Sequence, residues 1–584
     1  MNHGSWIGGS LQRRGWGRWR LRELVLQGRA HRSCKEQNHD LGEGQDRNGV
    51  AGLNHRGADE GRNRRGEDEG RDREMESLEF LQKNPNGGGE FLQKTQNAFF
   101  LLSKHLFPKR KNLPPSGPLS LPIIGHLYLL KKPFHRTLAR IAAQYGPILL
   151  LKLGSRRILL VSSSSAVEEC FTTNDIVFAD RPRFLLGKYL GFNNTTPATA
   201  SYGRHWRNLR RVTTNEIFSS ARLQMFSSIR SNEVHYLLQR LLIAGNSSKS
   251  VEMKSLLFEL TLNNITMMIG GKRYYGEDME DLDKARQFQD LIKELFSEAG
   301  ESNVVDFLPL LRWIGFNGLE KKLVRLQGKR DQFMQKLIED HRITRRQSKD
   351  EKVLFDVLLS LQEDDPNYYT DEIIIGIIQD LLMAGTDTSS GTIEWAISLL
   401  LNHPEVLKKA QAEIDIIVGQ GRLLNESDVP NLPYLHCIIN ETLRMYPAAP
   451  LLPHLSSESC NVGGFTVPRG TLLLVNIWAI HNDPKSWEEP RKFRPERMEG
   501  IGGVRERYKL MPFGSGRRSC PAESLALRVV GFTLGSLIQC FEWERVDEEL
   551  VDMSEGTGLT VSKAKPLEAK CKPRPAMLNF LSQL

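Results

Sequence analysis

The chain has few cysteines for its length, and their positions form no pairing pattern. Seven cysteines occur in 584 residues, at positions 34, 170, 437, 460, 520, 540 and 571. The number is odd, no Cys-x-x-Cys pair is present and the spacings match no disulfide framework, which argues against a disulfide-stapled secreted domain. We therefore expect free thiols in a reducing compartment.

The sequence also lacks a long hydrophobic run. Met1 is followed by polar, Gly-rich and Arg-rich sequence, which does not resemble a secretory signal. A membrane-spanning helix needs about 20 mostly apolar residues. The nearest candidate, Ala98–Phe107, is shorter and contains a serine, a lysine and a histidine. We expect this segment, helped by the basic residues 109–111, to lie in a membrane interface rather than to span a bilayer.

The first 97 residues lack the apolar side chains that a folded core needs. Residues 61–74 mix charges of both signs with glycine, and the pentapeptide EFLQK occurs at Glu79 and again at Glu90. Such a composition cannot offset the entropy lost on ordering the chain. We therefore interpret residues 1–97 as a disordered or spurious N-terminal extension, with Met75 as an alternative start.

The charge balance is basic, with a net charge of +9 and a pI near 9.1. Such a balance is compatible with nucleic-acid binding. Much of the arginine lies in the N-terminal extension, however, which lacks the interleaved aromatic residues and the repeats of an RNA-binding tail. We expect no nucleic-acid partner.

After the extension the chain changes character. Residues 98–112 hold the short apolar segment and its basic stretch, and residues 113–118, LPPSGP, predict a stiff proline-rich hinge. From residue 119 to 584 the pattern is that of one large globular domain. Two apolar runs, Ile148–Leu153 and Arg157–Ser162, flank a Gly-Ser pair and predict a β-hairpin.

Helical periodicity dominates beyond about residue 200. One long helix is predicted to begin after Thr370 as N-cap and to run to about Leu401. Another is predicted to begin at Pro404 and to end near Gly419. The segments after Cys540 are short and rich in turns. The expected fold class is mainly α with small β-sheets.

A glycine- and arginine-rich loop near the C-terminus contains the most informative cysteine. Residues 512–528 read PFGSGRRSCPAESLALR, so that Cys520 stands directly before a Leu/Ala-rich helical pattern. Backbone N–H groups and a helix N-terminus near the sulfur would favour a thiolate, which is a ligand for a soft metal. Taken alone, a single cysteine can equally be an inert small apolar residue of the core.

Polar residues interrupt the long helix at residues 384–389, AGTDTS, which include Asp387 and Thr388. Glycine and a run of hydroxyl residues weaken a helix interior, which suggests either a kinked core helix or a functional site. Farther along, Glu441 and Arg444 are three apart, so they share a helix face and can pair. Trp206 and Arg210 are four apart and also share a face.

The order of these motifs, with Phe513-x-x-Gly516-x-Arg518-x-Cys520 at its end, resembles that of the cytochrome P-450 monooxygenases. The resemblance covers about residues 100 to 584. Residues 109–149 and 205–223 resemble a plant microsomal subfamily associated with oxidation of isoflavonoids, lignans, indole glucosinolates and herbicides. The resemblance implies the cytochrome P-450 fold, an α-rich domain with a small β domain.

The resemblance also implies the cofactor and the site. Haem b would be bound through Cys520 as the iron ligand, because the family uses a proximal cysteine thiolate. Thr388 and Asp387 would deliver protons during oxygen activation. The remaining implied roles fall into two groups: cofactor-binding residues, with the propionates held by cations, and a buried structural triad on the proximal side. The first group comprises Trp206, Arg210, His454, Phe513, Gly516 and Arg518, and the second comprises Glu441, Arg444 and Arg497.

The implied partners are dioxygen, a small-molecule substrate, a membrane surface and the NADPH–cytochrome P-450 reductase, which would supply electrons from NADPH. The implied location is the cytosolic face of the endoplasmic reticulum membrane, with residues 98–112 as a truncated remnant of the family's anchor. Pocket residues are expected from four segments. These are Phe192–Tyr202, the helix near Met383, Leu451-Leu452 and Gly558–Val561.

Two positions depart from the family pattern. Ala522 stands where the family usually has glycine, and Met498 stands where it usually has an aromatic residue. If residue 522 has a positive φ, alanine costs about 1–2 kcal/mol there, and we expect haem still to bind, but less tightly.

The leading interpretation is a haem-thiolate monooxygenase that hydroxylates a small apolar or aromatic plant metabolite or a xenobiotic. The alternatives are a non-oxygenating haem-thiolate isomerase or dehydratase and a catalytically inactive haem-binding relative. Non-oxygenating relatives tend to lack the threonine that this chain keeps at Thr388. The hypothesis of a catalytically inactive relative is supported only by Ala522 and by the altered N-terminus.

Overall fold

The computed structural model describes residues 112–584 except 248, 277–280, 300–302, 316–317, 346–352, 502–505 and 559. The N-terminal extension 1–97 and the segment 98–111 lie outside the described residues. Leu106–Leu584 form a unit of their own, and the description below concerns that unit. The six cysteines among the described residues are all free, as the sequence predicted.

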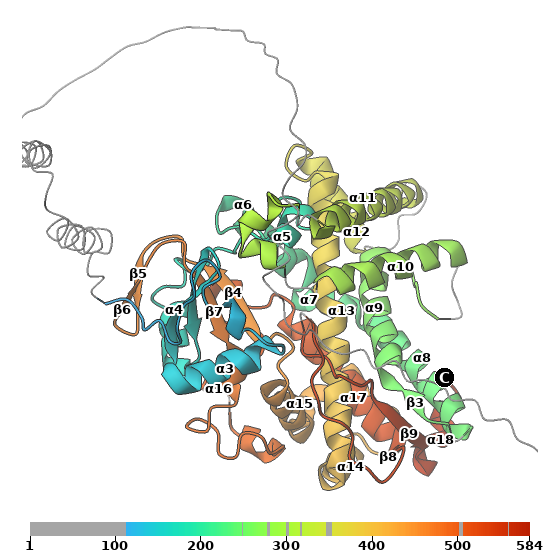
Figure 1. Ribbon diagram of the computed structural model, residues 1–584. Coiled ribbons are helices and arrows are strands. Elements are labelled where there is room, and N and C mark those ends of the chain that lie inside the picture. Colours follow the sequence, from blue (N-terminus) through green and yellow to red (C-terminus); the bar gives the residue numbers. More distant parts are fainter. Residues whose placement is uncertain are drawn as a thin grey trace, which may run out of the picture. The chain divides into compact units, whose positions relative to one another are not determined.

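Helices make up most of the unit, and the longest, α13 (Asp371–Asn402), runs through its middle (Figure 1). It packs against α9 (Met253–Gly270), α15 (Pro433–Met445) and α17 (Glu523–Cys540). The other α-helices are α3 (Phe134–Tyr145), α4 (Ser164–Phe171), α5 (Leu185–Tyr189), α6 (Arg204–Val212), α7 (Ser220–Met225), α8 (Ser227–Asn246), α10 (Leu282–Ala299), α11 (Gly318–Arg345), α12 (Leu354–Asp364), α14 (Pro404–Ile417), α16 (Ile477–His481) and α18 (Leu578–Leu581).

The two helices predicted from local patterns are both confirmed. α13 begins directly after Thr370, although the Thr370 side chain makes no capping hydrogen bond. α14 begins at Pro404, where proline is favourable because its missing N–H would have no intrahelical partner. Shorter turns of helix connect these elements: 3-10 turns at Leu127–Leu129, Val304–Asp306, Pro309–Arg312, Glu426–Asn431, Pro495–Met498, Gly516–Arg518 and Pro575–Met577, and a π-helical turn at Thr213–Ile217.

The β structure is confined to small sheets, as predicted. The largest has four strands in the order β1-β2-β7-β4, and the others pair β3 with β9 and β8, and β5 with β6. The strands are β1 (Ile148–Leu153), β2 (Arg156–Val161), β3 (Val251–Glu252), β4 (Leu451–Leu455), β5 (Cys460–Val462), β6 (Phe465–Val467), β7 (Leu472–Asn476), β8 (Phe541–Arg545) and β9 (Glu568–Pro573).

The predicted hairpin is confirmed as β1 and β2, which pair in antiparallel register with Leu149 opposite Leu160. Both side chains are buried, because the sheet packs one face against α3 and the neighbouring loops. Strand β2 also pairs in parallel with β7, with Ile158 beside Leu472. A segment more than 300 residues away in the sequence therefore completes the sheet.

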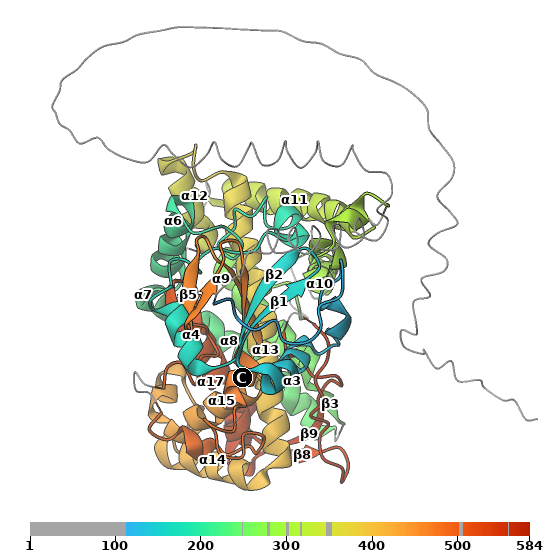
Figure 2. The same ribbon diagram turned by 60° about the vertical axis from the view of Figure 1, so that its left-hand side comes forward.

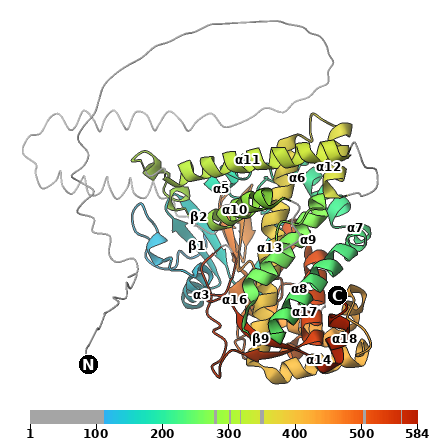
Figure 3. The same cartoon turned by 90° about the vertical axis from the view of Figure 1, so that its right-hand side faces the viewer.

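The four-stranded sheet and α3 lie on one side of α13, and α8, α9 and α10 lie on the other (Figures 1 and 3). Turned to bring the sheet forward, the unit shows β1 and β2 beside one another, with α15 and α17 lower in the view (Figure 2). This arrangement places β4, α13 and the start of α17 around one interior region. Among the described residues, no helix combines the length and the hydropathy that crossing a membrane requires.

Candidate functional site

The loop that carries Cys520 is held in a folded-back conformation. The Cys520 N–H donates to the carbonyl oxygen of Phe513 at 2.8 Å. Gly514 and Gly516 both adopt left-handed φ angles, +72° and +68°, which glycine accepts without steric cost. A side chain at Gly516 would also overlap the carboxylate of Asp175. Gly516 does not line the cavity described next, so the structure places it as a shaping residue of the loop.

A cavity of about 420 Å³ lies between this loop, α13, α6 and β4. Apolar side chains form most of its wall. Seven of the residues singled out in the sequence meet there although they come from four separate segments: Trp206 and Arg210 of α6, Thr388 of α13, His454 of β4, and Phe513, Arg518 and Cys520 of the loop.

Three arginines gather at this cavity. Burial, together with the neighbouring charges of Arg181 and Arg210, lowers the pKa of Arg518 to about 9, against a partly compensating effect of Asp180. Burial alone lowers the pKa of Arg181 to about 10. Each of the three donates to backbone carbonyl groups. Within the described ranges, none of the three forms an ion pair with a carboxylate.

The other two predicted propionate partners are engaged with the protein itself. The indole N–H of Trp206 donates to the Pro197 carbonyl at 3.1 Å, and the Arg518 guanidinium lies 4.2 Å from the Trp206 ring centroid. His454 Nδ1 is 2.9 Å from the Phe178 carbonyl oxygen. Burial holds the His454 pKa well below its usual value, and nearby Arg181 adds to the effect. His454 is therefore neutral and can contribute a hydrogen bond but not a charge.

These residues fit a haem. A haem offers large apolar faces, an iron that accepts a thiolate and two carboxylates that require cations. The cavity supplies apolar walls, the Cys520 sulfur on one side and three arginines that lack an anionic partner. Buried charges of one sign are costly when uncompensated, so a bound dianion would relieve the repulsion among Arg181, Arg210 and Arg518.

The surroundings of Cys520 differ from the expectation in two respects. Burial raises the pKa of its thiol, and this effect outweighs the opposing contributions of the Ala522 N–H and Arg210. Without iron, the loop does not by itself favour a thiolate. Ala522 is the N-cap of α17 with φ −103°, so the condition under which alanine would be strained here, a positive φ, is not met.

The hydroxyl-rich stretch of α13 leaves the helix continuous. Thr388 Oγ1 donates to the Ala384 carbonyl at 2.6 Å, and Thr392 Oγ1 donates to the Thr388 carbonyl at 2.7 Å. These bonds to the preceding turn satisfy the hydroxyl protons without opening the helix. A side chain at Gly385 would lie 2.9 Å from Cδ1 of Ile265 on α9. The glycine therefore allows the close approach of α9 and α13.

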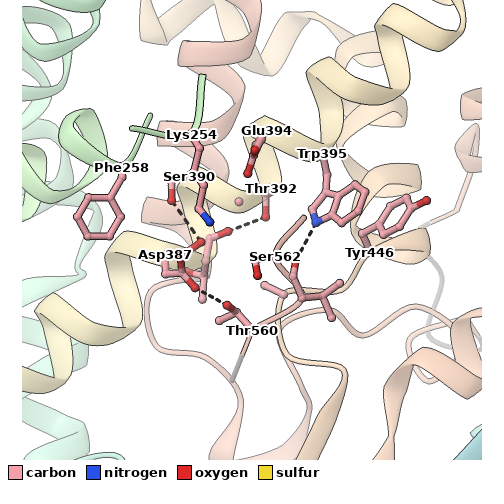
Figure 4. Close-up of a pocket in the computed structure, with 14 residues that line it drawn as sticks. Lys254, Phe258, Asp387, Ser390, Thr392, Glu394, Trp395, Tyr446, Thr560 and Ser562 are labelled. Carbon is pink, nitrogen blue, oxygen red and sulfur yellow. Dashed lines mark hydrogen bonds between the residues drawn. The ribbon is translucent and has the colours of Figure 1, made fainter. Parts of the chain in front are cut away.

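Asp387 does not line the cavity that contains Cys520. Its carboxylate accepts a hydrogen bond from the Thr560 hydroxyl and faces a separate small pocket of about 20 Å³ (Figure 4). That volume holds about one water molecule. Thr388 and Thr392 line both this pocket and the larger cavity, so the two spaces adjoin through their side chains.

The small pocket is polar and charged. Figure 4 shows Lys254 and Glu394 on the side of the pocket opposite Thr560. Burial raises the pKa of Glu394, although its carboxylate accepts the Leu567 N–H at 2.9 Å. Trp395 closes one end and donates its indole N–H to the Val561 carbonyl at 2.7 Å.

Glu441, Arg444 and Arg497 come together away from the cavity. Arg444 forms a bidentate pair with the Glu441 carboxylate at 2.7 and 2.8 Å, and Arg497 Nε donates to it at 2.9 Å. The Glu441 and Arg444 side chains are fully buried. Met498, in the same turn as Arg497, packs in a small apolar cluster with Cys437 and Trp487, a position where an aromatic ring is not required.

The expected pocket segments contribute unequally. Pro197 and Ala198 line the larger cavity, as does Leu452, whereas Val561 lines the small pocket. In the helix near Met383, Leu381 and Ala384 line the larger cavity as expected, whereas the Met383 side chain itself packs against the main core.

Sequence reasoning missed Arg181 and Asp380, which both line the larger cavity. Nothing local distinguishes Arg181. Asp380 carried a signal, because it is the only carboxylate in the apolar run 373–386.

Comparisons with known proteins agree with this geometry. The family model described as Cytochrome P450 matches residues 115–571. Cytochrome P450 81Q32 of Catharanthus roseus is 55% identical over 82% of this chain and 96% of its own length. The (+)-piperitol/(+)-sesamin synthase of Sesamum radiatum is 51% identical over 81% and 93%, and the isoflavone 2'-hydroxylase of Glycyrrhiza echinata is 50% identical over 81% and 95%.

Among solved structures, a zebra fish cytochrome P450 with progesterone superposes with a TM-score of 0.64 at 27% identity, covering 75% of this chain and 99% of that one. Sequence and fold thus agree over nearly all of the described residues. The chain belongs to the cytochrome P450 family, the haem-dependent monooxygenases.

Proposed function

We propose that this monooxygenase hydroxylates a small apolar or aromatic plant metabolite of the isoflavonoid, lignan or indole type, or a xenobiotic of similar shape. The observation that carries the proposal is the cavity of about 420 Å³ that joins Cys520 to an apolar wall on α13. Haem would occupy the part of this cavity beside Cys520, and the apolar side chains farther along its wall, among them Ile265, Met268 and Ile377, suit a small apolar or aromatic molecule. Relatives at about half identity are named isoflavone 2'-hydroxylase and (+)-piperitol/(+)-sesamin synthase.

Haem, when bound, supplies the activation of dioxygen. The chain's own residues would hold and orient it. The Cys520 sulfur would bind its iron, and Arg181, Arg210 and Arg518 would exchange their backbone carbonyl partners for its two carboxylates. The Thr388 hydroxyl, which already donates to a carbonyl, presents its oxygen as an acceptor to the cavity. The carboxylate of Asp387, one residue earlier, lines the adjoining small pocket and can accept a proton there.

Electrons would come from NADPH through the NADPH–cytochrome P450 reductase. Partly exposed cations near the Cys520 loop and the start of α17 support docking of an acidic partner there. These are Lys509, Arg517 and Arg528, each of which also pairs with a carboxylate of the chain and would share its charge with the partner.

The enzyme would lie on the cytosolic face of the endoplasmic reticulum membrane. Among the large apolar side chains that are strongly exposed, five lie in two short segments, 119–123 and 310–314, and such exposure is typical of a surface that meets a partner or a membrane. They are Leu119, Ile123, Leu310, Trp313 and Ile314, with exposures of 67–88%. Two of them, Leu119 and Ile123, follow the hinge after residues 98–112.

The first test is a reduced carbon monoxide difference spectrum of the full chain reconstituted with haem. The far-red Soret band of thiolate ligation is expected for the wild type and should be lost in Cys520→Ser. Turnover with isotopically labelled dioxygen should then place one labelled atom in the product. A rearranged or dehydrated product without label, or a histidine-type band in the wild type, would overturn the proposal.

A further inference from the structure

One carboxylate lines the cavity that contains Cys520. Within the described part of the chain, Asp380 is the only acidic residue on its wall, and Ile377, Leu381 and Ala384 surround it. Asp380, Ala384 and Thr388 are spaced four residues apart on α13. They therefore share one face of the helix, which is the face that the cavity exposes.

The Asp380 carboxylate is partly satisfied by the protein. Its Oδ2 accepts the Ala198 N–H at 2.7 Å, and the Thr196 hydroxyl also bonds to the carboxyl group. An ionised carboxylate offers about four acceptor positions, so capacity for a ligand donor remains. Burial raises the pKa of Asp380 to about 6, against these two hydrogen bonds and the charge of Arg330. The group is therefore mainly ionised at neutral pH.

The distance between Asp380 and Thr388 along α13 indicates how long a substrate that contacts both residues must be. Eight residues separate Asp380 from Thr388, which corresponds to about 12 Å along the helix axis. A substrate whose reacting carbon lies near Thr388 would reach Asp380 with its far end if it had the length of two or three linked rings. Between Asp380 and Thr388 the α13 face of the wall is formed by Leu381, Ala384 and Gly385, whereas the facing helix α9 contributes Thr261 and Asn264, so Asp380 is the only charged acceptor that the described wall offers such a molecule.

We propose that Asp380 accepts a hydrogen bond from a phenolic hydroxyl at the end of the substrate remote from the oxidised carbon. This inference rests on the proposed function and narrows its substrate class to hydroxylated aromatic molecules of that length. A ligand without the donor leaves the remaining acceptor positions of this half-buried carboxylate desolvated and without a partner, which costs binding free energy. A ligand with an anionic group at the same end is repelled.

A purely structural role for Asp380 makes a different prediction. The bond to Ala198 ties α13 to the loop 192–202, and the neighbouring Gln379 ties α13 to the end of α5, just before that loop, through the Leu190 carbonyl at 2.8 Å. If Asp380 served only as a tether, its loss would weaken every ligand alike. If it binds the substrate hydroxyl, its loss would weaken only ligands that carry one.

The test uses the full chain loaded with haem and two ligands that differ at one position, a hydroxyisoflavone and its methyl ether. Dissociation constants are measured by the haem absorption shift and by calorimetry, for the wild type, Asp380→Asn, Asp380→Leu and the control Gln379→Leu. The wild type and the control should prefer the hydroxyl ligand by about 10- to 100-fold, the range for a hydrogen bond to a charged group. Asp380→Leu should abolish the preference, and Asp380→Asn should reduce it.

Equal weakening of both ligands in the Asp380 variants, or no hydroxyl preference in the wild type, would overturn this inference and leave the monooxygenase intact. A protein with the thiolate band that binds neither ligand would overturn both this inference and the proposed substrate class. Absence of the thiolate band is the separate failure of the proposed function itself.

Discussion

The hydroxyl of Thr560 donates to the carboxylate of Asp387, across 173 residues of sequence. The bond ties the loop after β8 to α13 at the residue beside Thr388. It also orients the Asp387 carboxylate toward the small polar pocket, whose other side carries Lys254 and Glu394. Thr560 is thus a positioning residue for the acid.

Replacing Thr560 with valine removes the donor and keeps the side-chain volume. The Asp387 carboxylate should then lose its fixed orientation, and proton supply through Thr388 should become less efficient. We expect a several-fold rise in the hydrogen peroxide formed per NADPH consumed, while the thiolate band and the substrate dissociation constant stay unchanged. Thr560→Ser should restore coupling. An unchanged peroxide yield in Thr560→Val would contradict this role.

Glu441→Gln should destabilise the fold strongly. The substitution leaves the fully buried Arg444 and the mostly buried Arg497 without a counter-charge, and breaking a buried ion pair costs about 3–5 kcal/mol. Urea unfolding measures the loss. The matched control is Glu496→Gln, because Glu496 pairs with Lys409 at the surface and such pairs contribute about 0–1 kcal/mol. Equal effects of the two substitutions would refute the argument.

The stability of the fold should fall with acid partly because of Glu555. Burial raises the pKa of this carboxyl, but hydrogen bonds from His135 and Arg136 outweigh it and hold the pKa at about 2. A depressed folded-state pKa gives stability that is complete above the unfolded value, about 4.3, and is lost as the pH falls toward 2. Glu555→Gln should flatten the unfolding free energy against pH in that window. An unaltered slope would refute it.

Gly516→Ala should reduce haem retention. The position has φ +68°, and an added methyl group would overlap Asp175. The left-handed conformation alone costs about 1–2 kcal/mol for alanine, and relief of the overlap would shift the Cys520 loop. The ratio of haem to protein and the melting temperature report the effect. Gly203→Ala is the control, since nothing lies near its added carbon; a haem ratio equal to that of the control would count against the loop argument.

Local patterns were sufficient for elements whose signals lie within a few residues. The hairpin β1–β2 and the limits of α13 and α14 follow from alternation, N-terminal acids and proline at the first turn. They did not reveal that β2 pairs with β7 more than 300 residues later, because a strand's periodicity carries no information about its partner.

The sequence was sufficient to predict which residues belong to the site, but not the directions in which their side chains point. The motif order gathered Trp206, Thr388 and Cys520 correctly into one cavity. It could not show that Asp387 turns toward Thr560, because consecutive helical residues point about 100° apart and only tertiary packing decides which faces the cavity. Nor could it show the ordinary φ of Ala522, which depends on how α17 begins.

The three arginines at the cavity have a consequence for how the protein matures. Burial, with added repulsion from Arg181 and Arg210, depresses the pKa of Arg518, and the described hydrogen-bond partners of the three arginines are uncharged oxygen atoms. The cavity is therefore suited to bind a dianion, and the two haem carboxylates would compensate these positive charges. Protein without bound haem should therefore have a lower unfolding free energy and be degraded faster by proteases. The supply of cofactor would then limit how much enzyme accumulates in the cell.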